Sequence, residues 1–339
     1  MGYIGPELIK KLRVSYPGAK IVGVDLGFFA HCLTGADVLP ERNVDCQYFQ
    51  DVRKIDADLL KDVDAVVHLA AVSNDPMGNA YESVTAAINH QSSVEIAKLS
   101  KESGVSAYVF ASSCSVYGYA EGDARDENSE LNPLTAYAKS KINTELDICD
   151  LADDKFKITC LRFPTACGMS DRLRLDLVLN DFVASAVATK KITILSDGTP
   201  WRPLIDIKDM STAIDWGISR QADSSNQFLA INVGRTEWNY QVKDLADAVK
   251  ELMPDVAIEI NTEAAPDKRS YRVNFSQYAD MAPDHMPQVD LMQSIKELKA
   301  GLEKICFNNP DFRNSQFMRL KVLTSHQEKG LLTDQLEWV

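Results

Sequence analysis

"MGYIGPELIKKL" (1–12) decides how the rest of this sequence is interpreted. Gly2 and Gly5 lie three residues apart, and Pro6 opens a run with apolar residues at helical spacing that reaches Leu12. Proline is favoured in the first turn of a helix, because the N–H that it lacks has no partner there. The stretch is typical of the second half of a glycine-rich turn that leads into a helix and presents the helix N-terminus to a phosphate.

Four short apolar runs downstream predict buried β-strands, and helical patterns lie between them. The predicted strands are "AKIVGVDL" (19–26), "DAVVHLAA" (64–71), "AYVFASS" (107–113) and "KITCLRF" (157–163), and the predicted helices span residues 4–15, 80–103 and 135–152. Runs of this kind, apolar on both faces, are typical of a parallel sheet covered by helices. The alternation therefore predicts an α/β fold with a doubly wound parallel sheet, right-handed crossovers and ligands at the carboxyl ends of the strands.

The pattern loosens after about residue 165. "ITILSDGTPWRPLIDIKDM" (192–210) predicts a strand, a turn and a second strand, and helices are predicted over 240–253 and 290–304. We therefore expect a dinucleotide-binding domain over residues 1–165. Residues 166–339 are expected to form mainly a smaller substrate domain that is interleaved with the first. The polar tail, 310–339, receives no assignment.

Composition excludes several functional classes. The 339-residue chain is 45% hydrophobic and 25% charged, as expected of a globular protein, and its formal net charge of −13 argues against nucleic-acid binding. Seven scattered cysteines without a CxxC pair favour a reducing compartment over disulfides or a metal site. Since no apolar run approaches ~18 residues and no signal-peptide pattern is present, we expect a cytoplasmic protein without a membrane span.

The pair Tyr137 and Lys141 in "YAKSK" is the strongest candidate for chemistry. Residues four apart share a helix face, and a lysine ammonium beside a phenol lowers the phenol pKa, so the tyrosine could exchange a proton with a sugar or alcohol hydroxyl. The same spacing in "YPGAK", from Tyr16 to Lys20, contains a proline and a glycine that exclude a helix interior. Upstream, "FASSCSVYG" follows a predicted strand, which places Ser113 at the carboxyl edge of the sheet, ready to share a proton with Tyr137.

Taken in order, the motifs resemble those of an extended short-chain dehydrogenase/reductase of the nucleotide-sugar epimerase/dehydratase family, similar to UDP-glucose 4-epimerases. They are "GYIG", "GVDL", "HLAA", "SSCSVYG", "YAKSK", "LRF…G", "DGTPWRP" and "DKRSYRV". The resemblance runs from Gly2 to about Asn274 and implies a Rossmann-like domain that binds NAD. It also implies that Ser113, Tyr137 and Lys141 form the catalytic set.

The resemblance also places the cofactor. It implies that NAD contacts Gly2, Tyr3, Ile4, Gly5, Asp25, Asp51, Val52, Leu69, Ala70, Ala71, Asn89, Tyr137 and Lys141. Asp25 comes 20 residues after Gly5, where an acidic side chain binds the adenosine ribose hydroxyls. A carboxylate there repels a 2′-phosphate, and no arginine follows in "LGFFA", so NAD is favoured over NADP. Asp51 resembles an acid that contacts adenine, and Asn89 resembles an asparagine near the nicotinamide.

Fewer positions match on the substrate side. Ser113, Asn180, Arg202 and Arg269 correspond to substrate-binding positions of relatives, the last three at the nucleotide diphosphate, and Arg272 could replace Arg269. Guanidinium groups suit phosphate oxygens because they donate two parallel hydrogen bonds. We therefore expect a nucleotide-diphosphate sugar as the substrate.

The two residues after the catalytic serine narrow the reaction. Nucleotide-sugar 4,6-dehydratases carry an Asp–Glu pair there, whereas this chain has Cys114 and Ser115, so the acid needed to expel water is missing. The resemblance then implies epimerisation, most often at C4 of a UDP-hexose, through a transient keto sugar. A nucleotide-sugar 4-ketoreductase would use the same residues. The alternative of another class is a truncated, non-catalytic binder of sugar nucleotides.

Two further expectations come from the resemblance. In relatives, a strand and the first glycine of a GxxGxxG turn precede the residues equivalent to Gly2 and Gly5, so we expect a gap in the sheet where that strand lies. We also expect a natural start about ten residues upstream of Met1. The helices that correspond to 80–103 and 135–152 often pair across a dimer in this family, which implies a homodimer.

Overall fold

The computed structural model describes residues 1–35, 37–120, 122–261, 263 and 270–339. Its strands are β1 (Val22–Asp25), β2 (Cys46–Phe49), β3 (Ala65–His68), β4 (Ala107–Ser113), β5 (Lys157–Phe163), β6 (Thr165–Cys167), β7 (Lys191–Ile194), β8 (Trp201–Asp206), β9 (Phe228–Asn232), β10 (Asn239–Gln241) and β11 (Ala257–Ile260). Its α-helices are α1 (Gly5–Ser15), α2 (Asp75–Ala80), α3 (Glu82–Thr85), α4 (Ser92–Glu102), α5 (Ala136–Cys149), α6 (Val178–Thr189), α7 (Ile207–Ser219), α8 (Val242–Leu252), α9 (Ser276–Met281), α10 (Leu291–Lys304) and α11 (Arg319–Glu328). The four predicted strands are confirmed as β1, β3, β4 and β5.

The parallel sheet of the first half is split into two pieces. β3, β4, β5 and β9 form a four-stranded parallel sheet, in which Ser113 pairs with Phe163. β1 and β2 form a separate parallel pair, in which Asp25 pairs with Phe49. Among the described residues no strand joins β1 to β3, as expected from the missing strand of the sequence pattern. Asp25 and Ser113 each lie at the carboxyl end of a parallel strand, where the ligand site of such a fold is found.

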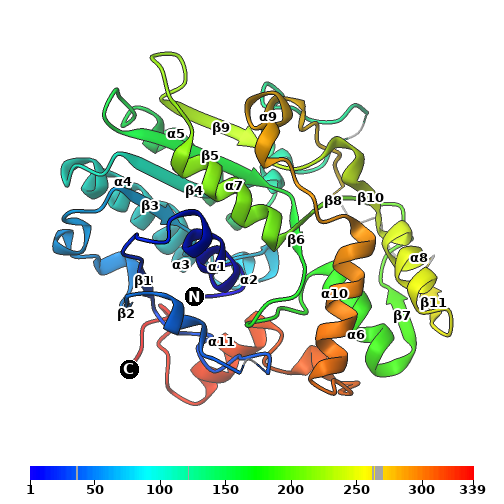
Figure 1. Ribbon diagram of the computed structural model, residues 1–339. Helices are drawn as coiled ribbons and strands as arrows, with labels where there is room; N and C mark the ends of the chain where they lie inside the picture. The colour runs from blue at the N-terminus through cyan, green and yellow to red at the C-terminus, as the bar shows by residue number, and fades with distance from the viewer. Residues whose placement is uncertain (36, 121, 262, 264–269) are drawn as a thin grey trace.

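The second half of the chain contributes to both parts of the molecule (Figure 1). β9 pairs with β5 and so completes the four-stranded sheet, while α7 packs on β4 and β5 and also against α1. Gly217 of α7 makes this close approach possible, because a Cβ there would lie 3.2 Å from the side chain of Val109. The remaining strands form two small sheets, β10–β8–β6 and β11–β7, which α6, α8 and α10 accompany.

The predicted helix over 80–103 is wrong as a single element. The segment begins earlier, with the Asn74 side chain accepting a hydrogen bond from the N–H of Met77 and capping α2. Tyr81 breaks the helix between α2 and α3, with φ −131° and ψ 54°. A π-helical stretch, Ala86–Gln91, then leads into α4. Periodicity alone does not reveal such interruptions, since a π-turn still places apolar residues close to their helical positions.

The tail that had no assignment is folded. α11 is followed by a short hairpin in which Leu332 and Trp338 form an antiparallel bridge. Leu323, Leu332 and Leu336 are buried in one apolar cluster with residues from the segment after β3, including Val72 and Ile88. Among the described residues, no helix combines the length and the apolar character needed to cross a bilayer.

Candidate active site

The end of β4 presents Ser113 at the edge of the sheet. A short 3-10 turn, Cys114–Tyr117, follows, and the Ser115 N–H donates to Ser113 Oγ at 3.2 Å. Cys114 is fully buried and its thiol donates to the Arg162 carbonyl oxygen at 3.1 Å, which directs it away from the neighbouring serine hydroxyls. Burial raises the pKa of the Cys114 thiol well above its usual value, so it stays protonated and inert.

α5 brings Tyr137 and Lys141 to the same edge. Thr135 caps this helix, with its Oγ1 accepting from the Ala138 N–H. The Lys141 ammonium is buried, donates to the Ala111 carbonyl oxygen at 2.7 Å and lies 5.5 Å from the centroid of the Tyr137 ring. The Ser113 side chain lies close enough to the Tyr137 hydroxyl to act on its pKa. The three residues predicted from separate motifs therefore meet at one point.

The predicted lowering of the Tyr137 pKa is wrong for the chain by itself. Burial, together with the negative charge of Asp75, raises the pKa of Tyr137 to about 12, although the Ser113 side chain and the Arg174 cation oppose the rise. Burial lowers the pKa of Lys141 to about 8. Sequence reasoning considered only the ammonium, whereas removal of both groups from water dominates here. Tyr137 is thus a protonated acid at neutral pH.

Residues that the sequence did not single out surround this centre. Asp75 accepts a hydrogen bond from Thr135 Oγ1 at 2.7 Å, one residue before α5 begins. Arg174 pairs with Asp176, with Nε 2.9 Å from Oδ1, and donates from Nη1 to Ser73 Oγ at 2.8 Å. The signal available was "RLRLD" (172–176), a largely buried basic stretch that begins five residues after the small strand β6 ends. Such a stretch is unusual, because buried arginines need partners.

The N-terminal turn has the geometry that its glycines predict. Gly5 is the first residue of α1, with Ile4 as its N-cap, so the Gly5 N–H has no partner within the helix. A Cβ on Gly2 would meet no atom within 4 Å, so this side of the turn is open. Tyr3 is buried instead: its hydroxyl donates to the Gly168 carbonyl oxygen at 2.6 Å. Its side chain therefore fixes the turn on the second half of the chain.

Asp25 lies at the end of β1 with its carboxylate partly exposed, at 30%. The Met1 ammonium donates to Oδ2 at 2.5 Å and the Gly27 N–H donates to Oδ1 at 2.6 Å. Burial works to raise the pKa of Asp25, but these two donors outweigh it and the pKa lies below its usual value. A carboxylate accepts about four hydrogen bonds, so the ionised Asp25 retains acceptor capacity for hydroxyl groups.

The other predicted cofactor residues follow β2 and β3. Leu69, Ala70 and Ala71 are half-buried directly after β3. Asp51 begins the turn that contains Val52, and both of its carboxylate oxygens accept from the Arg53 side chain, at 2.6–3.0 Å.

Asn89 lies behind these residues and joins two segments of the chain through hydrogen bonds. It is fully buried, its Oδ1 accepts from the Val72 N–H at 2.7 Å, and its Nδ2 donates to the Val72 carbonyl oxygen and to Ser140 Oγ. The side chain thereby joins the segment after β3 to α5, the helix that carries Tyr137 and Lys141.

Among the residues predicted to bind the substrate, Asn180 is part of the scaffold. It is fully buried, its Nδ2 donates to Tyr3 Oη and to the Arg174 carbonyl oxygen, both at 2.9 Å, and its Oδ1 accepts from Gly168 N–H at 3.1 Å. Arg202 is half-buried on β8, opposite Tyr240 of β10, and donates to the Trp201 carbonyl oxygen at 2.8 Å.

The other two predicted arginines are close together in the sequence. Arg272, the substitute for Arg269, lies with its guanidinium 5.3 Å from the Trp201 ring and donates to the Gly122 carbonyl oxygen at 2.6 Å. Arg269 itself is outside the described residues. Tyr271, which the sequence reasoning missed although it lies inside "DKRSYRV", is buried close enough to Arg202 and Tyr137 for their charges to affect its pKa, which burial raises.

Comparison with known proteins shows to which family the chain is related. The model of the NAD dependent epimerase/dehydratase family matches residues 1–234. The chain belongs to this family. It is therefore an enzyme of a family that uses NAD, and its structure is the α/β architecture of that family.

Individual relatives are more distant. A protein described as an uncharacterized UDP-glucose epimerase, YtcB, from Bacillus subtilis (strain 168) is 33% identical over 157 residues, which is 45% of this chain and 48% of that protein. The chain thus matches about half the length of this relative.

Two solved structures are similar in fold. The NAD dependent NDP-hexosamine 5,6-dehydratase TunA has a TM-score of 0.77 at 20% identity over 91% of this chain and 96% of TunA. The UDP-glucuronic acid 4-epimerase from Bacillus cereus, solved with UDP-glucuronic acid and NAD, has a TM-score of 0.74 at 20% identity over 90% of this chain and 97% of that one.

The residues of this epimerase/dehydratase family member fit NAD. The open side of Gly2 at the N-terminus of α1 suits a pyrophosphate, and the partly exposed Asp25 carboxylate suits ribose hydroxyls. Tyr137 and Lys141 would lie at the nicotinamide end. When bound, NAD supplies a hydride acceptor for the sugar carbon and then a hydride donor.

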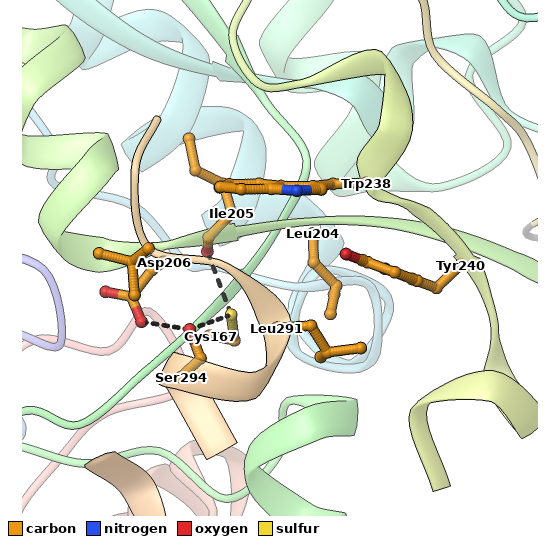
Figure 2. A pocket seen from close by; sticks show the side chains of 9 residues that line it. Cys167, Leu204, Ile205, Asp206, Trp238, Tyr240, Leu291 and Ser294 are labelled. Carbon is orange, nitrogen blue, oxygen red and sulfur yellow. Dashed lines mark hydrogen bonds between the residues drawn. The ribbon is translucent and has the colours of Figure 1, made fainter. Parts of the chain in front are cut away.

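A small cavity in the second half is separate from this centre (Figure 2). Its volume is about 10 Å³, and it lies beneath the Trp238 and Tyr240 rings. At its floor Ser294 Oγ donates to Asp206 Oδ2 at 2.7 Å, and Cys167 Sγ lies 3.9 Å from the same hydroxyl. Burial raises the pKa of Asp206 to about 6. The space suits one water molecule at most, so this cavity is not a substrate site.

Proposed function

We propose that this enzyme epimerises a nucleotide-diphosphate sugar, at C4 of a UDP-hexose, through a transient keto sugar. The observation that carries the proposal is the meeting of three side chains at the carboxyl end of β4. Ser113 lies close enough to the Tyr137 hydroxyl to act on its pKa, and Lys141 is buried beside the same ring. This arrangement suits proton transfer to and from a sugar hydroxyl. Family membership supplies the cofactor for the accompanying hydride transfer.

The roles of the residues follow from their chemistry. Ser113 holds the reacting hydroxyl through its Oγ and passes the proton to Tyr137. Tyr137 must act as a base when the sugar is oxidised and as an acid when the ketone is reduced. With the pKa of Tyr137 at about 12, the basic form requires positive charge nearby, which Lys141 contributes from one helical turn away. Arg202 supports the diphosphate from β8.

The side chains after Ser113 favour epimerisation over dehydration. Cys114 is buried and protonated, and Ser115 carries no acid, so neither can protonate a departing hydroxyl. Asp75 comes nearest to being an acid of this kind. Its carboxylate accepts a hydrogen bond from Thr135 Oγ1 at the start of α5. A 4-ketoreductase uses the same three residues and is distinguished from an epimerase only by its stoichiometry.

The test is incubation of the purified chain with UDP-glucose, UDP-N-acetylglucosamine and UDP-glucuronic acid, each with NAD. Formation of the C4 epimer, followed by NMR, with NAD in catalytic amount and no net NADH formed, is the expected result. A reaction that consumes NADH in proportion to a 4-keto sugar would instead identify a ketoreductase. Binding of the sugar nucleotides with no turnover in either assay would identify a binder and overturn the proposal.

We also propose that the enzyme is a homodimer. A groove of about 270 Å³ lies between α3, the π-helical stretch and α5, lined by Asn79, Glu82, Ala86, His90, Leu134, Ala136, Lys139, Ser140 and Asn143. Leu146 on α5 is 63% exposed, whereas Ile148 is fully buried in the core of its own chain. The exposed leucine and the groove on the same helices support pairing of these helices across a dimer.

A further inference from the structure

The C-terminal end of the chain lies against the part of the site that the proposed function assigns to adenosine. α11 and the hairpin after it pack against the loops that follow β1, β2 and β3, which belong to the first half of the sequence (Figure 1). We call residues 329–339 the C-terminal clasp. Asp25 directly precedes the first of these loops, and Asp51 lies in the second.

The clasp holds the loop after β1 through Trp338. Its indole N–H donates to the carbonyl oxygen of Leu26, at 2.7 Å, and Leu26 directly follows Asp25. The indole ring lies 5.9 Å from Phe28 and 5.3 Å from His326, and the His326 Nε2 lies 3.2 Å from the Phe28 carbonyl oxygen. The backbone on the carboxyl side of Asp25 is therefore fixed by the last residues of the chain.

The clasp holds the loop after β2 through Arg53. The Arg53 guanidinium donates from Nε and Nη2 to the two Asp51 oxygens and from Nη1 to the carbonyl oxygen of Gln335, at 2.7 Å. A planar guanidinium bound on two sides has one orientation. The clasp thus sets the position of the Arg53–Asp51 pair.

The clasp is anchored by burial. Leu336 is fully buried and Leu332 is 4% exposed, and both belong to the apolar cluster that contains Val72 and Ile88. Val52, which the resemblance places in contact with NAD, packs against the same cluster. Burial of these two leucine side chains stabilises the packing of the hairpin against the cluster. The clasp is therefore a fixed part of this surface.

We propose that the C-terminal clasp forms a wall of the adenosine end of the NAD site and positions Asp25 and Asp51 there, an inference that rests on the proposed function. Trp338 and Arg53 act as positioning residues, through the backbone of Leu26 and through the Asp51 carboxylate. The clasp contributes to the affinity for the adenosine half of the cofactor and has no role at the sugar.

The test measures equilibrium binding without turnover. The Kd values of NAD, ADP-ribose and UDP are determined by calorimetry for the full chain, for a chain that ends at Gly330, and for Trp338→Phe, Arg53→Met and Asp334→Ala. Trp338→Phe keeps the ring and removes the N–H, while Asp334→Ala changes an exposed residue of the same hairpin as the matched control.

The shortened chain is expected to bind NAD and ADP-ribose at least tenfold more weakly, and the two single variants about two- to tenfold more weakly, as the loss of one or two hydrogen bonds implies. The Kd of UDP should not change in any variant. The Asp334→Ala variant should bind all three ligands with the Kd values of the full chain. If the shortened chain does not fold, the two single variants decide the outcome.

Unchanged or tighter binding of NAD by Trp338→Phe and Arg53→Met would overturn the proposal for the clasp. An equal loss of UDP affinity in these variants would also overturn it, because it would indicate general damage to the fold. If the full chain binds UDP but no NAD or ADP-ribose, the proposed function fails together with the clasp. If the full chain binds all three and the variants match it, only the clasp fails.

Discussion

The Lys141 ammonium lies 5.5 Å from the centroid of the Tyr137 ring, one helical turn earlier on α5. The same ammonium donates to the Ala111 carbonyl oxygen at 2.7 Å, on the strand that ends in Ser113. Lys141 therefore joins the helix that carries the tyrosine to the strand that carries the serine. Substitution of Tyr137 or Lys141 should therefore distinguish the contribution of each residue to activity from its contribution to stability.

Tyr137→Phe should abolish proton transfer while leaving the site intact. We expect kcat to fall by about 10²–10⁴, the usual contribution of a general acid–base group, with the Kd of UDP within about twofold of the parent. Steady-state kinetics and calorimetry measure the two quantities. Tyr16→Phe is the matched control, because Tyr16 belongs to the second YxxxK match and lies at the end of α1. Equal losses in both variants would contradict the assignment of Tyr137.

Lys141→Met should give a more stable but inactive protein at pH 7. The folded pKa of about 8 lies below the ordinary 10.5, so the unfolded chain binds the proton more tightly. The charged lysine therefore lowers the free energy of unfolding below pH 8, and this penalty is relieved as pH rises from 8 to 10.5. The shift corresponds to at most about 3 kcal/mol, reduced by the lost hydrogen bond to Ala111.

Urea unfolding of parent and Lys141→Met between pH 7 and pH 10 checks this prediction. The difference in stability should shrink as pH rises, and a difference that is independent of pH would contradict it. Lys139→Met, an exposed lysine on the same helix, is the control and should show no such trend.

Asp206→Asn should remove part of the pH dependence of the free energy of unfolding between pH 4 and pH 6. The folded pKa of about 6 lies above the ordinary 3.8, so the folded chain binds the proton more tightly between these values. The free energy of unfolding of the parent should therefore fall as pH rises from 4 to 6 through this group. The asparagine can still accept from the Lys208 N–H. It can also donate to Ser294, which lies beside Asp206 in Figure 2. Parallel curves of stability against pH for parent and variant would refute the prediction.

Leu146→Asp should convert the proposed dimer to a monomer. A carboxylate placed where two copies of α5 would meet has to lose its hydration, which disfavours association. Light scattering coupled to size-exclusion chromatography should report the mass of one chain for the variant and of two for the parent. Leu195→Asp, at a leucine that is 79% exposed and outside these helices, should keep the parental mass. A monomeric parent would refute the proposal directly.

The sequence by itself determined the features that depend on local pattern. The strands over β1, β3, β4 and β5 were predictable because short β-rich apolar runs bounded by helical patterns are a local signal. Tyr137 and Lys141 were predictable as a pair because one helix places them on one face. Ser113 was predictable because a strand that ends in serines exposes them at the sheet edge.

Only the tertiary structure decided the features that depend on distant segments. The pKa of Tyr137 is governed by burial and by Asp75, which lies 62 positions earlier in the chain. Asn180 is bonded inside the scaffold because the fold brings Tyr3 and Gly168 to it. Trp338 reaches Leu26 across 312 residues of sequence, although nothing in the polar tail predicts its partner. Periodicity reports which face of an element is apolar, but the identity of the surface that covers this face is set only when the whole chain packs.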